Sequence, residues 1–99
     1  RGALDAFVVT LGARARGQAL PVVEGLRARG VSVGWDPAGH GLGGQMKRAD
    51  RSGARVAVLI GDDELDRGAV TVKDLARGTQ AEAPLDLDGL AAHLGRAAD

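Results

Sequence analysis

The chain contains no cysteine, and aromatic residues make up only 2% of it. Without thiols it has neither a disulfide framework nor a thiolate metal site, which agrees with a reducing compartment. Few aromatic side chains mean that Ala, Val, Leu and Gly must fill the core. No apolar run approaches the roughly 20 residues of a membrane-spanning helix, and no signal-peptide pattern is present. We therefore expect a cytoplasmic protein with no membrane partner.

An excess of charge of either sign is also missing, because 13 Lys and Arg residues balance 13 Asp and Glu residues. A zero net charge argues against a protein that coats nucleic acid through its overall electrostatic field. Local clusters remain: a basic one at Lys47, Arg48, Arg51 and Arg55, and an acidic corner at Asp62, Asp63, Glu64 and Asp66. Such clusters are commonly solvated faces. Charge alone therefore does not select a function.

The residues that could form a catalytic centre do not come together in the sequence. A Ser-His-acid or Cys-His arrangement is implausible, because His40 lies in a loop and His93 in the last helical segment. The acidic corner lacks the spaced oxygen ligands and the glycine of a calcium loop. We expect no catalytic site, no metal site and no cofactor in this chain.

The central apolar segment, Arg55 to Ile60, is closed by Gly61 and predicts a strand covered on both faces, as in a parallel sheet. Two further strands are expected before it, at Ala6 to Leu11 and Val31 to Trp35. Helices are expected at Ala13 to Arg29 and, after a glycine-rich loop, from about Leu42 to Arg51. This order predicts parallel strands joined by right-handed crossovers. Pro21 interrupts the first helix, which either kinks there or begins near Leu20.

The second half of the chain predicts a hairpin and a last helix. Asp62 to Asp66 fits one helical turn capped by Asp62. The predicted strands are Ala69 to Leu75 and Thr79 to Ala83, joined by a tight turn at Arg77-Gly78 and ended by Pro84. The last helix is capped by Asp86 or Asp88 and has an apolar face of Leu87, Leu90, Ala91 and Leu94. We expect one domain over residues 1–99, a three-layer α/β/α structure with a mixed five-stranded sheet.

Two kinds of binding site follow from these elements. An open parallel sheet binds ligands beyond the carboxyl ends of its strands, yet the turn from Leu11 to Gly17 has neither a G-x-G-x-x-G motif nor a P-loop. The segment Gln45 to Asp50 is the other candidate, since Met46 and Ala49 or Asp50 share one helix face. It is either an ordinary amphipathic helix with Met46 in the core, or an edge that offers amide, carboxylate and cation to unpaired bases.

The segment GLGGQMKRADRSGARVAVLIGDDELDRGAVTVKDLARGTQ resembles the C-terminal anticodon-binding domain of class IIa aminoacyl-tRNA synthetases, in particular that of histidyl-tRNA synthetases. The matching residues include Leu42, Gln45, Lys47, Ala49-Asp50-Arg51, Gly53-Ala54-Arg55 and Val72-Lys73-Asp74-Leu75. The resemblance implies a five-stranded mixed sheet with one antiparallel strand and three helices. It also implies binding of the histidine tRNA anticodon loop. The implied RNA-binding positions are Gln45, Met46, Lys47, Asp50, Glu64, Val72, Lys73 and Asp74.

The resemblance also implies a longer parent protein, because the class II catalytic segments are absent from these 99 residues. The parent would be a homodimeric, ATP- and magnesium-dependent histidine–tRNA ligase whose catalytic domain is the protein partner of this one. Gly43-Gly44 stands where many relatives carry two lysines, which removes charge that binds phosphate. That difference favours an alternative function: a synthetase-like regulatory or protein-interaction domain that has lost RNA binding. A flavodoxin-like small-molecule domain is the third hypothesis.

Overall fold

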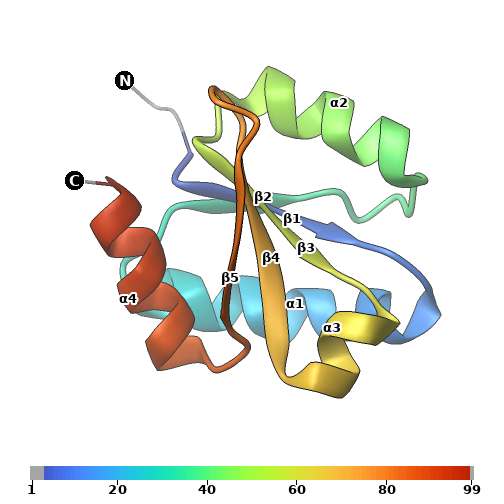
Figure 1. The fold of residues 1–99 in the computed structure, drawn as a ribbon. Helices are drawn as coiled ribbons and strands as arrows, with labels where there is room; N and C mark the ends of the chain where they lie inside the picture. Colours follow the sequence, from blue (N-terminus) through green and yellow to red (C-terminus); the bar gives the residue numbers. More distant parts are fainter. Residues whose placement is uncertain (1–3, 99) are drawn as a thin grey trace.

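The computed structural model describes residues 4–98, with side chains described to residue 95 (Figure 1). The strands are β1 (Ala6–Thr10), β2 (Val33–Trp35), β3 (Val56–Ile60), β4 (Ala69–Asp74) and β5 (Gln80–Pro84). The helices are α1 (Ala13–Ala28), α2 (Leu42–Ser52), α3 (Asp62–Arg67) and α4 (Leu87–Ala98). Every predicted strand is therefore present, with ends that differ by one or two residues. None of these helices is long and apolar enough to cross a bilayer.

The five strands form one mixed sheet in the order β2-β1-β3-β4-β5. β1 pairs in parallel with β2 and β3, while β4 is antiparallel to both β3 and β5. β4 alone therefore runs against the other four strands, which confirms the predicted mixed sheet. The parallel part is built from β-α-β crossovers. In the antiparallel part the short helix α3 joins β3 to β4, and a hairpin turn joins β4 to β5.

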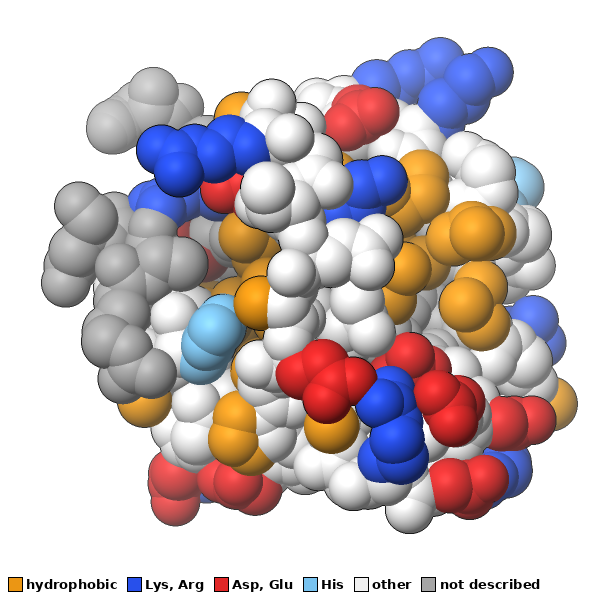
Figure 2. Space-filling model, in the orientation of Figure 1, with side chains coloured by type: hydrophobic (Ala, Val, Ile, Leu, Met, Phe, Trp, Pro, Cys, Tyr) orange, Lys and Arg blue, Asp and Glu red, His pale blue; other side chains and the backbone are white. Residues whose placement is uncertain are grey.

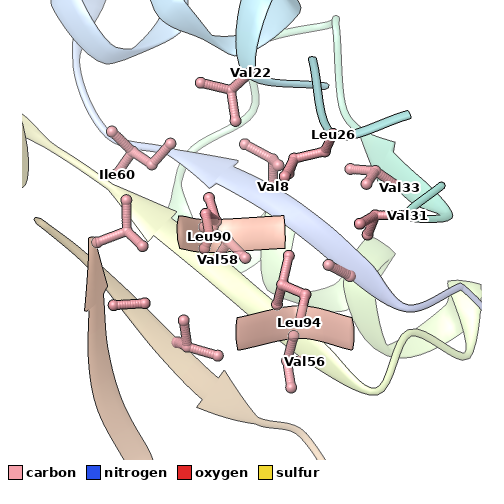
Figure 3. Packing of buried hydrophobic residues seen from close by; sticks show 14 of the residues in the cluster. Val8, Val22, Leu26, Val31, Val33, Val56, Val58, Ile60, Leu90 and Leu94 are labelled. Carbon is pink, nitrogen blue, oxygen red and sulfur yellow. The ribbon is translucent and has the colours of Figure 1, made fainter. Parts of the chain in front are cut away.

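Helices cover both faces of the sheet, with α1 and α4 on one side and α2 on the other (Figure 1). On the first side, Leu26 of α1 and Leu90 and Leu94 of α4 pack onto Val8 and Val58 (Figure 3). All five are nearly inaccessible to solvent, and burying each such side chain contributes about 1.5–3 kcal/mol. The three-layer α/β/α architecture predicted from the sequence is confirmed.

The second face of the sheet is covered unevenly. There α2 packs against β1 and β2, over a smaller core of Phe7, Val9, Ala49, Ala54 and Ala57. The register pairs Leu59 with Thr71 and Ala57 with Lys73. Since directly opposed residues point to the same face of a sheet, Thr71 and Lys73 lie on the α2 side. Over β4 and β5 no described helix covers this face.

The helices differ from the predictions in three places. α1 is one helix from Ala13, so a start near Leu20 is wrong. Pro21 has no N–H to donate to the Gly17 carbonyl oxygen, but both residues are exposed, so water can bond that oxygen instead. The predicted turn after β3 is a fourth, short helix. Its cap is Gly61 and not Asp62, because Glu64 Oε1 accepts the Gly61 N–H at 2.8 Å. In α4 the Asp86 alternative is confirmed: its carboxylate accepts the Gly89 N–H at 2.7 Å.

Candidate nucleic-acid interface

The side of α2 that faces β3 and β4 carries three of the predicted site residues. Met46 is half-buried and packs against the small core together with Leu59 of β3. Asp50 is exposed and lies one turn further along α2, on the same side as Met46 because residues i and i+4 stack on a helix. Lys47 is exposed beside them. Because α2 packs over β1 and β2, these side chains form a wall beside the uncovered part of the sheet.

β4 supplies the floor next to this wall. Lys73 and Thr71 are half-buried and point to the α2 side of the sheet. We call the surface made by Met46, Lys47, Asp50, Leu59, Thr71 and Lys73 the ledge. In Figure 2 hydrophobic side chains lie in a hollow on this face, between α2 and a group of acidic side chains over α3. The ledge thus combines apolar surface, one carboxylate and two cations.

Glu64 closes the ledge at the end nearest α3. Its Oε1 atom caps the helix, and its Oε2 atom accepts a hydrogen bond from Thr71 Oγ1 at 3.2 Å. Arg67 also lies near Glu64 Oε2, at 3.6 Å, and pairs with Glu82 of β5. Both carboxylate oxygens of Glu64 are therefore engaged, so the side chain is held in place beside the floor. Glu64 thus lies at one end of the ledge, and its place at the border of an RNA-binding surface stays a prediction.

Gln45 does not belong to the ledge. Its side chain is only 3% exposed, and its Oε1 atom accepts the Thr10 N–H at 2.8 Å. Its Nε2 atom donates to the carbonyl oxygens of Thr10 at 2.7 Å and His40 at 2.6 Å. The structure contradicts the prediction that this amide is offered to bases, because the backbone already occupies it. Gln45 instead fixes α2 to the carboxyl end of β1, where a small-molecule ligand of a doubly wound fold would bind.

Val72 and Asp74, like Gln45, hold the fold together. Val72 is opposite Val58 and is 6% exposed, in the core beneath α4 on the far side of the sheet. The prediction that it borders the RNA-binding surface is therefore contradicted. Asp74 accepts the N–H groups of Ala76 and Arg77, both at 2.9 Å, and so fixes the turn between β4 and β5. Asp74 is opposite Val56, which belongs to the core beneath α4, so its Cβ points to the far side of the sheet as well. The prediction that Asp74 borders the RNA-binding surface is therefore contradicted too.

A buried carboxylate that the sequence analysis did not single out anchors the far side of α2. Asp36 is 6% exposed, and its Oδ2 atom lies 2.5 Å from His40 Nδ1 and 3.2 Å from Arg48 Nε. Burial alone would raise the pKa of Asp36, but the Ala38 N–H, His40 and Arg48 together outweigh it and lower the pKa. Asp36 therefore stays charged and ties α2 to the loop after β2. An aspartate two residues before a loop amide is a typical turn signal.

Sequence reasoning missed Leu59, Thr71 and Gln80 as surface-forming residues. Gln80 is exposed on β5 directly opposite Lys73, so its Cβ points to the same face. The alternation of side chains along the predicted strands was the signal that could have found all three. Within the described residues, no group of three or more His, Asp or Glu side chains could hold a metal ion.

Comparisons with known proteins agree with this architecture. A family model described as an anticodon binding domain matches residues 5–92. The chain is 45% identical to a histidine–tRNA ligase of Rhodococcus erythropolis over 83 residues, which cover 84% of this chain and 20% of that protein. It is 49% identical to the Rubrobacter xylanophilus histidine–tRNA ligase over 78 residues, which cover 79% of this chain and 18% of that one. The chain thus spans about a fifth of the length of these curated relatives.

Solved structures show the same relationship. Apo histidyl-tRNA synthetase of Staphylococcus aureus superposes with a TM-score of 0.86 at 34% identity, covering 95% of this chain and 27% of that one. The enzyme from a Nostoc species gives a TM-score of 0.81 at 32% identity, covering 98% and 22%. The RNA binding domain of a Cryptosporidium parvum threonyl-tRNA synthetase, at 21% identity, shares the fold with a TM-score of 0.77. The chain belongs to the anticodon-binding domain family, in the form that histidyl-tRNA synthetases carry.

Proposed function

We propose that this chain recognises the anticodon loop of histidine tRNA by receiving unpaired bases on the ledge. The observation that carries the proposal is that Met46 of α2 packs on the same face of the sheet as Lys73 of β4, in a chain of the anticodon-binding family. Asp50 lies one turn along α2 on the Met46 side. Sequence-specific RNA recognition targets unpaired loop nucleotides whose base edges are accessible. An open sheet face beside a helix suits such nucleotides.

Each part of the ledge has a chemical role in this proposal. The half-exposed side chains of Met46 and Leu59 give an apolar surface on which a base can lie. The Asp50 carboxylate accepts hydrogen bonds from base amino or imino groups, which distinguishes bases that donate at that edge from those that do not. Lys47 and Lys73 are placed to hold phosphates, which positions the RNA without reading its sequence.

Glu64 and Thr71 set one limit of the base-binding surface. Their mutual hydrogen bond holds both side chains in place at the α3 end of the ledge. The other acidic residues of α3, Asp62, Asp63 and Asp66, are exposed at the same end. Their negative charge disfavours phosphates there. The RNA backbone is thus directed towards α2 and the β4–β5 turn.

We further propose that residues 1–99 act as one domain of a longer, cytoplasmic histidine–tRNA ligase. This rests on relatives of which the chain spans about a fifth. In that setting, a catalytic domain outside this chain would use ATP and magnesium, and the parent would be a homodimer. This chain would then contribute tRNA selection, by placing the anticodon while the acceptor end reaches the catalytic domain.

The proposal is tested by fluorescence anisotropy with two labelled stem-loops, one with the histidine anticodon and one with a scrambled loop. The histidine loop should bind at least about tenfold tighter, because one lost base contact costs about 1–3 kcal/mol and 1.4 kcal/mol is tenfold. Arg16→Ala, an exposed cation on α1, is the matched control and should leave this ratio unchanged. Equal affinities would refute base reading. Failure of both loops to bind would favour the regulatory alternative, which Gly43-Gly44 suggests.

A further inference from the structure

A polar cavity lies where the end of α2 meets the β4–β5 turn. It has a volume of about 570 Å³ and is lined by Gly53, Ala54, Arg55, Asp74, Ala76 and Arg77, among others. Arg55 immediately precedes β3, and Arg77 lies in the turn that follows β4. Two guanidinium-bearing residues thus flank one cavity, although they are 22 positions apart in the sequence.

Both arginines are exposed, and neither forms an ion pair with a described side chain. Among the described side chains, no carboxylate lies within 4.0 Å of the charged group of either one, whereas Arg14, Arg29, Arg48 and Arg67 all form ion pairs. Arg27 donates to the Val33 carbonyl oxygen instead. The cavity therefore gathers cations that the protein's own acids do not neutralise.

The backbone on both sides of the cavity is fixed. The Leu75 N–H donates to the Arg55 carbonyl oxygen at 3.0 Å, which joins the two walls. In the turn, the Gly78 N–H donates to the Asp74 carbonyl oxygen at 2.8 Å, and Gly78 adopts a φ of 76° that favours glycine. Arg77 is thus carried by an ordered turn. Ordered backbone reduces the entropy lost when a side chain binds a ligand.

The Asp74 carboxylate is the one acidic group among the described residues that line the cavity. Its Oδ1 atom accepts two backbone N–H groups, which already satisfy much of its hydrogen-bonding capacity. Two guanidinium groups against one carboxylate leave the lining with a net positive charge. The lining charge therefore favours an anion, and the planar fork of arginine suits an anion with several oxygens, such as a phosphate.

The cavity lies at the end of the sheet that the ledge approaches. Its lining residue Asp74 directly follows Lys73 of the floor, and Gly53 directly follows α2, which carries Asp50. The acidic corner lies at the other end of β4, where the strand begins after α3. Positive charge therefore increases along the ledge from α3 towards the hairpin turn, and an RNA backbone is attracted to the Arg55–Arg77 end.

We propose that Arg55 and Arg77 clamp one phosphate group of the RNA whose bases occupy the ledge. The identity of that RNA rests on the proposed function, but the clamp itself requires only a phosphodiester. The clamp contributes affinity that does not depend on sequence. It is distinct from the base-reading residues, since neither arginine lies on α2 or in β4.

The test combines two measurements on the folded chain. The first is NMR observation of the arginine Nε–Hε signals, and of the Met46 methyl signal as the reporter of the ledge, during titration with the histidine-anticodon and scrambled stem-loops. The second is the dependence of log K on log salt for the chain and for the double variant Arg55→Ala/Arg77→Ala. Loss of one phosphate contact should reduce that slope by about 0.7 to 1 and leave the ratio between the two stem-loops unchanged. Arg16→Ala, an exposed arginine on α1, is the control and should not change the slope.

The outcomes separate the clamp from the proposed function. Signals of Arg55 and Arg77 that shift with both stem-loops, with a reduced slope in the double variant, support the clamp even if the two loops bind equally and base reading fails. Signals of the ledge that shift while those of Arg55 and Arg77 stay unchanged would overturn the clamp and keep the proposed function. No change in either set would overturn both. Arg55→Lys/Arg77→Lys keeps the charge but not the fork, and should recover only part of the affinity.

Discussion

The amide of Gln45 binds both backbone groups of Thr10, accepting its N–H at 2.8 Å and donating to its carbonyl oxygen at 2.7 Å. A side chain amide that pairs in this way mimics another strand, here at the carboxyl end of β1. It joins α2 to the centre of the sheet and so fixes the position of the wall relative to β4. The position of the ledge therefore depends on a residue that is itself inaccessible to RNA.

Gln45→Ala should destabilise the fold. It leaves the N–H and carbonyl of Thr10 and the carbonyl of His40 without their partner, and each buried unsatisfied group costs about 1–3 kcal/mol. We expect the free energy of unfolding, measured with urea at neutral pH, to fall by at least about 2 kcal/mol. Lys47→Ala, an exposed change on the same helix, should alter it by less than about 0.5 kcal/mol. Equal effects of the two substitutions would refute this role.

Acid should weaken the attachment of α2 through Asp36. The folded-state pKa of Asp36 is lowered, with burial opposing the shift and Ala38, His40 and Arg48 outweighing it. A carboxyl whose folded pKa is depressed stabilises the fold above its unfolded value of 3.8, and this contribution is lost as the pH falls through the folded pKa. Urea midpoints between pH 6 and about 2 should therefore fall less steeply in Asp36→Asn than in the parent chain. Asp88→Asn, at an exposed carboxylate, is the comparison; identical profiles for the parent and Asp36→Asn would contradict the assignment.

Gly43 and Gly44 should respond in opposite ways to replacement by alanine. A Cβ at Gly43 would meet nothing within 4 Å, whereas one at Gly44 would lie 2.9 Å from the His40 Cβ. Gly43→Ala should raise the free energy of unfolding by up to about 1 kcal/mol through helix propensity, and Gly44→Ala should lower it because the His40 loop must move. Thermal unfolding of the two variants decides this; stabilisation by both would show that the His40 loop moves at little cost.

Gly43→Lys should also strengthen RNA binding, because it restores a charge that binds phosphate.

Asp50→Ala and Lys47→Ala should affect RNA binding differently. Removing the Asp50 carboxylate should cost about 1–3 kcal/mol with the histidine stem-loop and little with the scrambled one, because a base contact is lost. Removing the Lys47 ammonium should weaken both loops alike and reduce the salt slope by about 0.7 to 1. Anisotropy titrations at two salt concentrations measure both effects. A loss of the same size for both loops in Asp50→Ala would assign that residue to general electrostatics.

The order of the elements could be predicted because it depends on local patterns. The apolar run before Ile60 and the alternation of side chains around Val72 indicate strands whatever surrounds them. The same alternation places Val72 on the face opposite Lys73, so its burial was readable from the sequence. The choice between a helix that begins at Ala13 and one that begins near Leu20 was not, because an exposed Pro21 is tolerated where solvent replaces the lost hydrogen bond.

The role of Gln45 shows why the site was harder to predict than the fold. Gln45 is four residues before Ala49, so helical spacing alone puts it on the buried face. A polar side chain at such a position is buried only if partners are available. Those partners, the backbone of Thr10 and of His40, come from segments brought together by the tertiary structure. The Arg55–Arg77 cavity likewise depends on a hairpin register that the sequence does not state.

The central claim, that bases occupy the ledge, is tested most directly through Met46, the single methionine of the chain. Its methyl group gives one NMR signal at the centre of the ledge, and the methyl groups of Leu90 and Leu94 report on the opposite face of the sheet. On titration with the histidine-anticodon stem-loop, the Met46 signal should shift and the signals of Leu90 and Leu94 should stay in place. A Met46 signal that remains unchanged while the RNA binds would contradict the account.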